Sequence, residues 1–222
     1  MLGKLKVTAI SSLHSILNYV AKGLLAVLFF CTAAHADLSD DFVARLQSMQ
    51  TLQGSFSQTL SDPVGVELQR TQGTFTLQRP DHFYWKTLPP YSQEVISNTQ
   101  KVWVYDPDLE QVTVHSRSSI ANSPAAILSA NATQIDDAYY VESHKDGNKD
   151  VFTLLPKKGQ VDIPFQRIEF SFEGELLTEL VLYDSLDQQT RIVLSEIRLN
   201  EDVDEAIFHF KAPQGVDVIF AE

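Results

Sequence analysis

The chain has 222 residues and a formal net charge of −12, with 44% hydrophobic residues, 21% charged residues and a single cysteine. These values exclude a disordered or collagen-like chain and a small disulfide scaffold, and the length suits one domain with a core of its own. The 29 acidic residues outnumber the 17 basic ones, which argues against a general nucleic-acid binder, because such a protein needs a basic excess to neutralise phosphates.

The first 36 residues differ from the rest of the chain. They contain three lysines and no acidic residue, and a continuous apolar run covers residues 24–31. The run is followed by Ala34-His35-Ala36, the small-x-small pattern that signal peptidase accepts. It is shorter than the roughly 20 apolar residues that an uncleaved membrane anchor needs. We therefore predict that residues 1–36 are a cleaved signal peptide and that residues 37–222 are the mature domain.

Without the leader, the chain carries a formal charge of −15 and no cysteine, because residues 1–36 hold three of the basic residues and Cys31. A secreted chain without cysteine takes no stability from an oxidising compartment. Together with the lysine-bounded apolar run, this composition indicates the bacterial periplasm. The negative charge also disfavours loose adhesion to anionic lipid headgroups.

An amphipathic helix is predicted at the start of the mature domain, over residues 37–49. Its apolar residues are spaced four, four and three apart and share one helical face; they are Leu38, Phe42, Leu46 and Met49. Asp40 and Asp41 lie in the first turn, where the helix dipole favours negative charge.

After this helix the apolar period changes to two, which predicts strands with one apolar and one polar face. The alternating pairs are Phe75/Leu77, Phe83/Trp85, Trp103/Tyr105, Val112/Val114, Phe152/Leu154, Ile168/Phe170, Leu180/Leu182, Ile192/Leu194 and Phe208/Phe210. Short connectors around Gly147 and Gly174 favour an antiparallel meander over helical crossovers. An alanine-rich segment after Ser123-Pro124 predicts a second short helix between the strands. The predicted fold is one mainly β (α+β) domain, a large, strongly curved antiparallel sheet with a few helices covering one face.

The sequence shows no catalytic or metal-binding motif. The mature histidines are far apart and have no metal-ligand spacing; they are His82, His115, His144 and His209. A G-x-S-x-G elbow, a P-loop and a dinucleotide-binding glycine pattern are also absent. We expect no enzyme, metal or cofactor, although a hydrolase whose paired carboxylates are dispersed along the sequence stays open. The 11 mature Phe and two Trp form either an ordinary core or the lining of a ligand cavity, and composition does not decide between them.

Three segments, residues 73–85, 101–112 and 208–216, resemble the outer-membrane lipoprotein carrier family (LolA) in their order and spacing. The similarity extends over essentially the whole mature chain. It implies a periplasmic chaperone that takes acylated lipoproteins from an inner-membrane ABC transporter complex to an outer-membrane receptor and acts as a monomer. It also implies an incomplete antiparallel β-barrel with a helical lid over a hydrophobic cavity.

The resemblance further implies a role for Arg79, in Gln78-Arg79-Pro80. In the family, an arginine at this point hydrogen-bonds to the lid and is needed to accept cargo. A guanidinium suits this task because its five fixed donors bind several carbonyls and its charge resists permanent burial. The alternative is a surface arginine before a turn.

The matching lid covers residues 122–130, with Ile127 and Leu128 facing inward. Leu46 on the opening helix and the sheet residues Phe83 and Trp85 complete the predicted lipid-cavity lining. Ordinary core packing is the alternative for these apolar residues.

One turn departs from the family pattern. Where relatives commonly carry Asp-Gly or Asn-Gly, this chain has Ser97-Asn98-Thr99-Gln100-Lys101. Because Thr tolerates positive φ poorly, we expect a longer or less regular turn. Fold does not fix ligand, so a periplasmic carrier of another lipid or glycolipid on the same scaffold is the alternative function.

Overall fold

The computed structural model describes residues 38–116, 127–128, 132–159 and 163–221, all of which belong to one compact unit. The predicted signal peptide and its cleavage point lie outside the described residues. So does most of the predicted lid over residues 122–130, of which Ile127 and Leu128 are described and are helical. Within the described ranges, no helix has the length and apolar character needed to cross a membrane.

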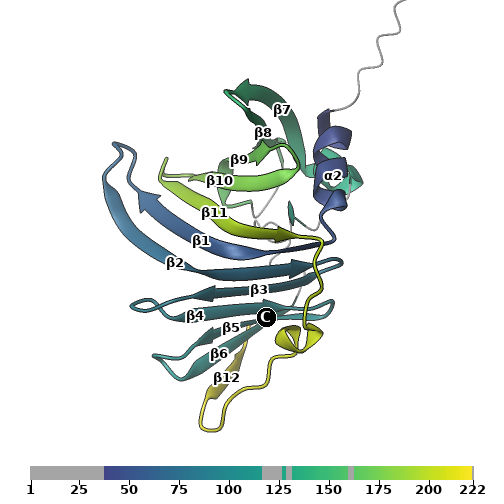
Figure 1. The fold of residues 1–222 in the computed structure, drawn as a ribbon. Helices are drawn as coiled ribbons and strands as arrows, with labels where there is room; N and C mark the ends of the chain where they lie inside the picture. Colours follow the sequence, from purple (N-terminus) through teal and green to yellow (C-terminus); the bar gives the residue numbers. More distant parts are fainter. Residues whose placement is uncertain (1–37, 117–126, 129–131, 160–162, 222) are drawn as a thin grey trace, which may run out of the picture. The chain divides into compact units, whose positions relative to one another are not determined.

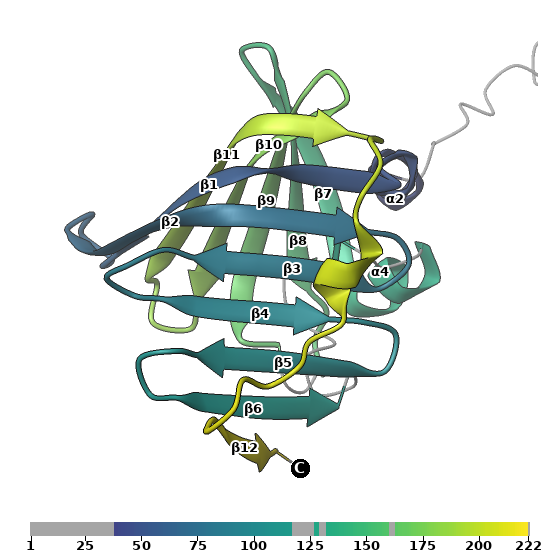
Figure 2. The same cartoon turned by 60° about the horizontal axis from the view of Figure 1, so that its bottom comes forward.

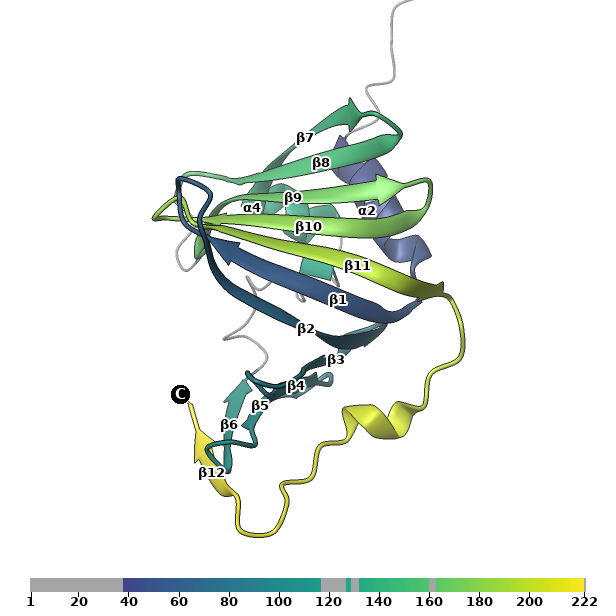
Figure 3. The ribbon, with the colours of Figure 1, turned by 60° about the vertical axis from the view of Figure 1, so that its left-hand side comes forward.

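A single curved sheet makes up most of the described chain (Figure 1, Figure 3). Its twelve described strands follow the order β12-β6-β5-β4-β3-β2-β1-β11-β10-β9-β8-β7, so the sheet is open and β12 and β7 are its edges. All neighbouring strands are antiparallel except β12 and β6, which are parallel. The predicted mainly β class and curved antiparallel sheet are confirmed.

The strands are β1 Thr51–Ser61, β2 Glu67–Gln78, β3 His82–Thr87, β4 Gln93–Ser97, β5 Lys101–Asp106, β6 Gln111–Ser116, β7 Tyr139–Asp146, β8 Lys149–Pro156, β9 Phe165–Glu173, β10 Leu176–Asp184, β11 Gln189–Leu199 and β12 Asp217–Phe220. The helices are α2 Leu38–Ser48, α4 Ala132–Ala138 and the short 3₁₀ helix η2 Glu205–Phe208. Gly147 and Gly174 both take positive φ in the tight turns β7–β8 and β9–β10, where a residue without Cβ is favoured.

The main core lies on the concave face of the sheet, against α2 and α4 (Figure 3). Phe42, Leu46 and Met49 are at most 1% exposed, whereas Leu38 is 41% exposed and stays outside the core. The predicted opening helix is therefore confirmed with three of its four apolar residues buried. Because burial removes these side chains from water, the hydrophobic effect is the main force that holds the helix on the sheet.

A second, smaller cluster lies on the opposite face of β4, β5 and β6. The register places Trp103 opposite Ile96, and Tyr105 opposite Val112, and residues paired in this way share a face. Ile96 and Val112 are at most 1% exposed there, because the C-terminal segment runs across these strands (Figure 2).

The predicted strand at Phe208 and Phe210 is wrong. The segment forms η2 instead, and the Asp204 side chain caps it by accepting the amide of Ala206 at 3.0 Å. The chain crosses the strands rather than pairing with them. Its two phenylalanines alternate because both rest on the sheet, with the Phe210 ring 5.7 Å from that of Tyr105.

Asn98 closes the unusual turn between β4 and β5. Its side-chain Oδ1 accepts the amides of Gln100 and Lys101 at 2.9 and 3.1 Å, and its own amide donates to the Lys101 carbonyl at 3.1 Å. Thr99 is not among the residues with positive φ. The side chain thus replaces the usual glycine turn, and the pairing of Ser97 with Val102 keeps the register.

Candidate functional site

A small apolar cavity lies on the concave face of the sheet. Its volume is about 40 Å³, which is room for about three water molecules. It is lined only by apolar side chains, namely Leu52, Phe75, Leu77, Phe83, Trp85, Leu128, Leu180, Ile192 and Leu194. A ligand larger than a few atoms can enter only if this lining separates.

The structure brings the five predicted lining residues together, because Phe83 and Trp85, which are partly buried, pack against the core cluster that holds the other three. Phe83, Trp85 and Leu128 border the cavity. Leu46 and Ile127 are 0% and 2% exposed. They belong to the core cluster around the cavity and are not among the described residues that border it. The predicted residues therefore meet in space, whereas their contact with lipid stays a prediction.

An aromatic layer forms one end of this cavity. The rings of Phe56 and Trp85 stack with centroids 3.7 Å apart. Gly73 lies directly beneath them, since a Cβ at this position would be 2.7 Å from Phe56 Cε1 and 1.8 Å from the carbonyl oxygen of Lys86. Both distances are too short for any side chain, so the stack and the β2–β3 pairing require glycine here.

Arg79 follows β2 and holds two helical segments together. Its Nε–H is shared between the carbonyl oxygens of Leu46 and Met49 at 3.0 and 3.1 Å, and Nη2 donates to the carbonyl oxygen of Leu128. The last carbonyls of a helix have no intrahelical partner, and the helix dipole attracts a cation to this end. One guanidinium therefore ties the end of α2 to the segment that covers the cavity.

The backbone around Arg79 fixes the direction of its side chain. The Arg79 amide donates to the carbonyl of Gln50 at 2.9 Å, and the following peptide bond to Pro80 is cis. Burial lowers the pKa of the Arg79 guanidinium, and the charge of Asp81 opposes this shift. The desolvation of the cation offsets part of the free energy of its hydrogen bonds. Breaking the contacts of Arg79 with Leu46, Met49 and Leu128 therefore costs less free energy than the hydrogen bonds alone would require.

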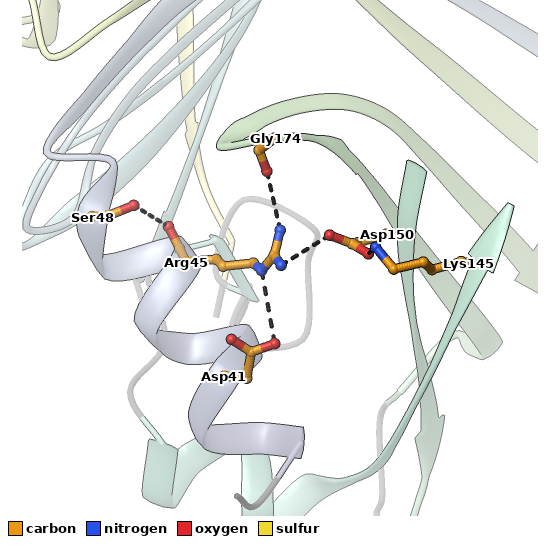
Figure 4. A network of polar contacts seen from close by, with 6 residues as sticks. All are labelled: Asp41, Arg45, Ser48, Lys145, Asp150 and Gly174. Atoms are coloured by element: carbon orange, nitrogen blue, oxygen red, sulfur yellow. Dashed lines mark hydrogen bonds and ion pairs between the residues drawn. The ribbon is translucent and has the colours of Figure 1, made fainter. Parts of the chain in front are cut away.

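A second arginine, Arg45, fastens α2 to the sheet (Figure 4). It donates to the Gly174 carbonyl at 3.1 Å and to Asp150 Oδ2 at 3.0 Å, and its guanidinium lies 5.3 and 5.6 Å from the ring centres of Phe152 and Phe172. These contacts fix α2 to β8 and to the turn between β9 and β10.

Sequence reasoning missed Arg45. Its ion-pair partner Asp150 is 105 positions away along the chain. The one available signal was a cation beside the buried positions Phe42 and Leu46 of an amphipathic helix. Hydrogen bonds from Lys145 and then from Arg45 hold the pKa of Asp150 below its usual range, so this carboxylate stays charged where both cations need it.

This arrangement buries apolar surface. Its parts are an apolar cavity, an arginine that is hydrogen-bonded both to α2 and to Leu128 beside that cavity, and a second arginine that fixes α2 to the sheet. In the described part of the chain, no three His, Cys, Asp or Glu side chains gather as metal ligands.

The sequence matches known proteins over most of its length. A family model described as outer membrane lipoprotein carrier protein LolA matches residues 47–211. An outer-membrane lipoprotein carrier protein of Hahella chejuensis is 37% identical over 84% of this chain and 90% of its own length. One of Pseudomonas fluorescens is 39% identical over 88% of this chain and 96% of its own length.

The fold has solved counterparts too. The crystal structure of an uncharacterized conserved protein from Thermus thermophilus superposes with a TM-score of 0.50 at 11% identity, over 82% of this chain and 97% of that one. This likeness concerns the fold alone, whereas the family model and the sequence relatives identify the family. The chain belongs to the outer-membrane lipoprotein carrier family LolA.

Proposed function

We propose that this chain is a monomeric periplasmic carrier that takes acylated lipoproteins from an inner-membrane ABC transporter complex and delivers them to an outer-membrane receptor. The observation that carries the proposal is the wholly apolar cavity bordered by Leu128, whose carbonyl accepts a hydrogen bond from Arg79. Each methylene removed from water gains about 0.8 kcal/mol, so acyl chains do not cross an aqueous space unaided. Family membership supports the same function.

The mechanism is the movement of Leu128 away from the cavity and back onto it. In the empty protein Leu128 borders the cavity, whose volume of about 40 Å³ has no room for an acyl chain. Loaded acyl chains displace Leu128 and break its hydrogen bond to Arg79. The free-energy difference between the two states has to be small, because a lid that is too stable in either state blocks loading or unloading.

The test of the function is depletion of the protein in cells. Outer-membrane lipoproteins should then accumulate at the inner membrane. Native mass spectrometry of protein purified from the periplasm should show a bound acylated polypeptide. A bound free lipid or glycolipid, with normal lipoprotein sorting after depletion, would replace the proposal by another lipid-carrying function.

The test of the closure is Arg79→Leu. The variant should keep the fold and acyl binding but fail in transfer, since the three hydrogen bonds to carbonyls that favour the closed, unloading state are gone. Arg198→Leu is the control, because Arg198 is an exposed arginine on β11 whose side chain is 58% exposed. Normal delivery of bound lipoproteins from Arg79→Leu to outer-membrane vesicles that hold the receptor, measured beside this control, contradicts the role assigned to Arg79.

A further inference from the structure

On β2 and β3, and at Gln58 of β1, the concave face changes from apolar to polar one residue layer beyond the Phe56–Trp85 stack. Residues two apart on a strand share a face, and cross-strand partners do too. Phe56 pairs with Gly73, and Gly73 pairs with Thr87 two positions after Trp85. The next inward-facing positions along β1, β2 and β3 are Gln58, Thr71 and Thr87, of which Gln58 pairs with Thr71.

These polar residues line a groove of about 370 Å³. It presents three amides and four hydroxyls, from Gln58, Gln69, Gln93, Thr71, Thr87, Tyr91 and Ser92, and the carboxylates of Asp106 and Asp108 border it. We call this site the polar groove. It opens toward the turns β3–β4 and β5–β6, at the end of the sheet away from Arg79.

The seven amide and hydroxyl side chains of the polar groove make no hydrogen bond to any residue that the structure describes. On the other face of the same strands, Lys86 contacts Glu94 at 2.9 Å and Ser55 donates to Glu196 at 2.7 Å. The groups of the polar groove thus remain available to a ligand, while part of the outward-facing groups are paired with one another.

We propose that the polar groove binds the hydrogen-bonding part of the cargo, the ester and amide groups that join acyl chains to the polypeptide and the first peptide groups after them. This inference rests on the proposed carrier function. Amides and hydroxyls both donate and accept hydrogen bonds. They can therefore pair with ester and amide groups, whereas an acyl chain offers them no hydrogen-bonding partner. An acyl chain in the polar groove would leave these groups unpaired at a cost in free energy.

The spacing of the two sites fits one molecule that occupies both. Two residues along a strand span about 7 Å, so the polar groove begins about that far beyond the aromatic layer at the end of the apolar cavity. Acyl chains that enter under Leu128 then place their polar linkage at Thr71 and Thr87. The polypeptide leaves the carrier beside Tyr91, which is 51% exposed, and away from Arg79.

The test compares two probes on one variant. Thr71→Val with Thr87→Val removes both hydroxyls and keeps the β-branched shape. A synthetic peptide with an N-terminal diacylglyceryl-cysteine should bind about tenfold more weakly, as expected for two lost hydrogen bonds, whereas palmitate binding stays unchanged. The matched control is Thr74→Val with Thr76→Val, on the outward face of β2, which should change neither affinity.

Each outcome decides one question. An equal loss for both probes, or no loss for the lipopeptide, overturns the polar groove. Failure of the unaltered protein to bind either probe overturns the carrier function itself. A photoreactive benzoylphenylalanine in place of Tyr91 should crosslink to the peptide part of the bound lipopeptide, and the same group in place of Leu176, the first residue of β10, should not. The reverse crosslinking pattern also overturns the polar groove.

Discussion

Replacing Arg79 by lysine keeps the positive charge at this position and changes the geometry of the hydrogen-bond donors. The guanidinium reaches the carbonyls of Leu46 and Met49 through Nε and that of Leu128 through Nη2. A lysine ammonium is a single point with no fixed fork, so it cannot serve α2 and Leu128 together. The variant therefore loses the link between them.

The size of the effect follows from the hydrogen bonds that lysine cannot make. Hydrogen bonds to a charged group contribute about 1.5–3 kcal/mol each, and the partial burial that lowers the pKa of Arg79 means that some of this is offset by desolvation. We therefore expect the closed state to be destabilised by about 1.5–2 kcal/mol, the lower end for one such bond. This raises the population of the open state by about 10- to 30-fold.

A fluorescent fatty acid reports the open population. When only a minor state binds, the apparent Kd is the intrinsic Kd divided by the fraction of that state, so Arg79→Lys should tighten binding by about 10- to 30-fold. Arg198→Lys serves as the control and should leave the affinity unchanged. Equal or weaker fatty-acid binding by Arg79→Lys would show that Arg79 does not hold the cavity shut.

Three further variants test the framework of the site. Gly73→Ala should destabilise the fold by about 3 kcal/mol in urea unfolding, because the new Cβ would meet the Phe56 ring and the backbone carbonyl of Lys86. Gly65→Ala is the control, since Gly65 has a φ of +87° but open space around it, and it should cost about 1 kcal/mol. Arg45→Met should lower the thermal midpoint by about 3–6 °C and speed amide exchange in α2, and unchanged exchange would show that Arg45 does not fasten the helix. Burial raises the pKa of Tyr139 to about 12, above its unfolded value of about 10. Ionisation of Tyr139 therefore leaves the stability of the protein unchanged below pH ~10 and lowers it as pH rises from there toward 12. Its hydroxyl has no partner among the described residues, so Tyr139→Phe should stabilise the protein by about 1 kcal/mol and reduce the alkaline loss, and equal pH dependence in both proteins would contradict this.

Eight of the twelve described strands carry a predicted alternating pair, because period-two alternation is a local property, whereas β1, β4, β7 and β12 carry none. Phe75 and Leu77, or Phe170 and its neighbours, are buried where the pattern predicts. The prediction failed at Phe208 and Phe210 because alternation also arises when an irregular segment lies across a sheet. The capping side chain of Asp204, which starts a 3₁₀ turn, is the local signal that distinguishes the two cases.

The contacts that Arg79 and Arg45 make could be predicted from the sequence only in part. Arg79 was identified through family resemblance, and no local pattern contains its three acceptors, which lie 30 to 49 positions away. Arg45 had no such help, and its partners Asp150 and Gly174 are more distant still. Polar contacts of this kind depend on the register of the whole sheet, which local periodicity does not determine.

The polar groove shows what alternation leaves undecided. In the sequence, Gln58, Thr71 and Thr87 look like ordinary solvent-facing strand residues. The register places them on the same face as Phe56 and Trp85, so one face of three strands is apolar at one end and polar at the other. These side chains are only partly buried, so water satisfies them in the empty protein and they add nothing to the packing of the core. A site for a molecule with an apolar end and a hydrogen-bonding end gives this change a purpose, and an acylated polypeptide is such a molecule.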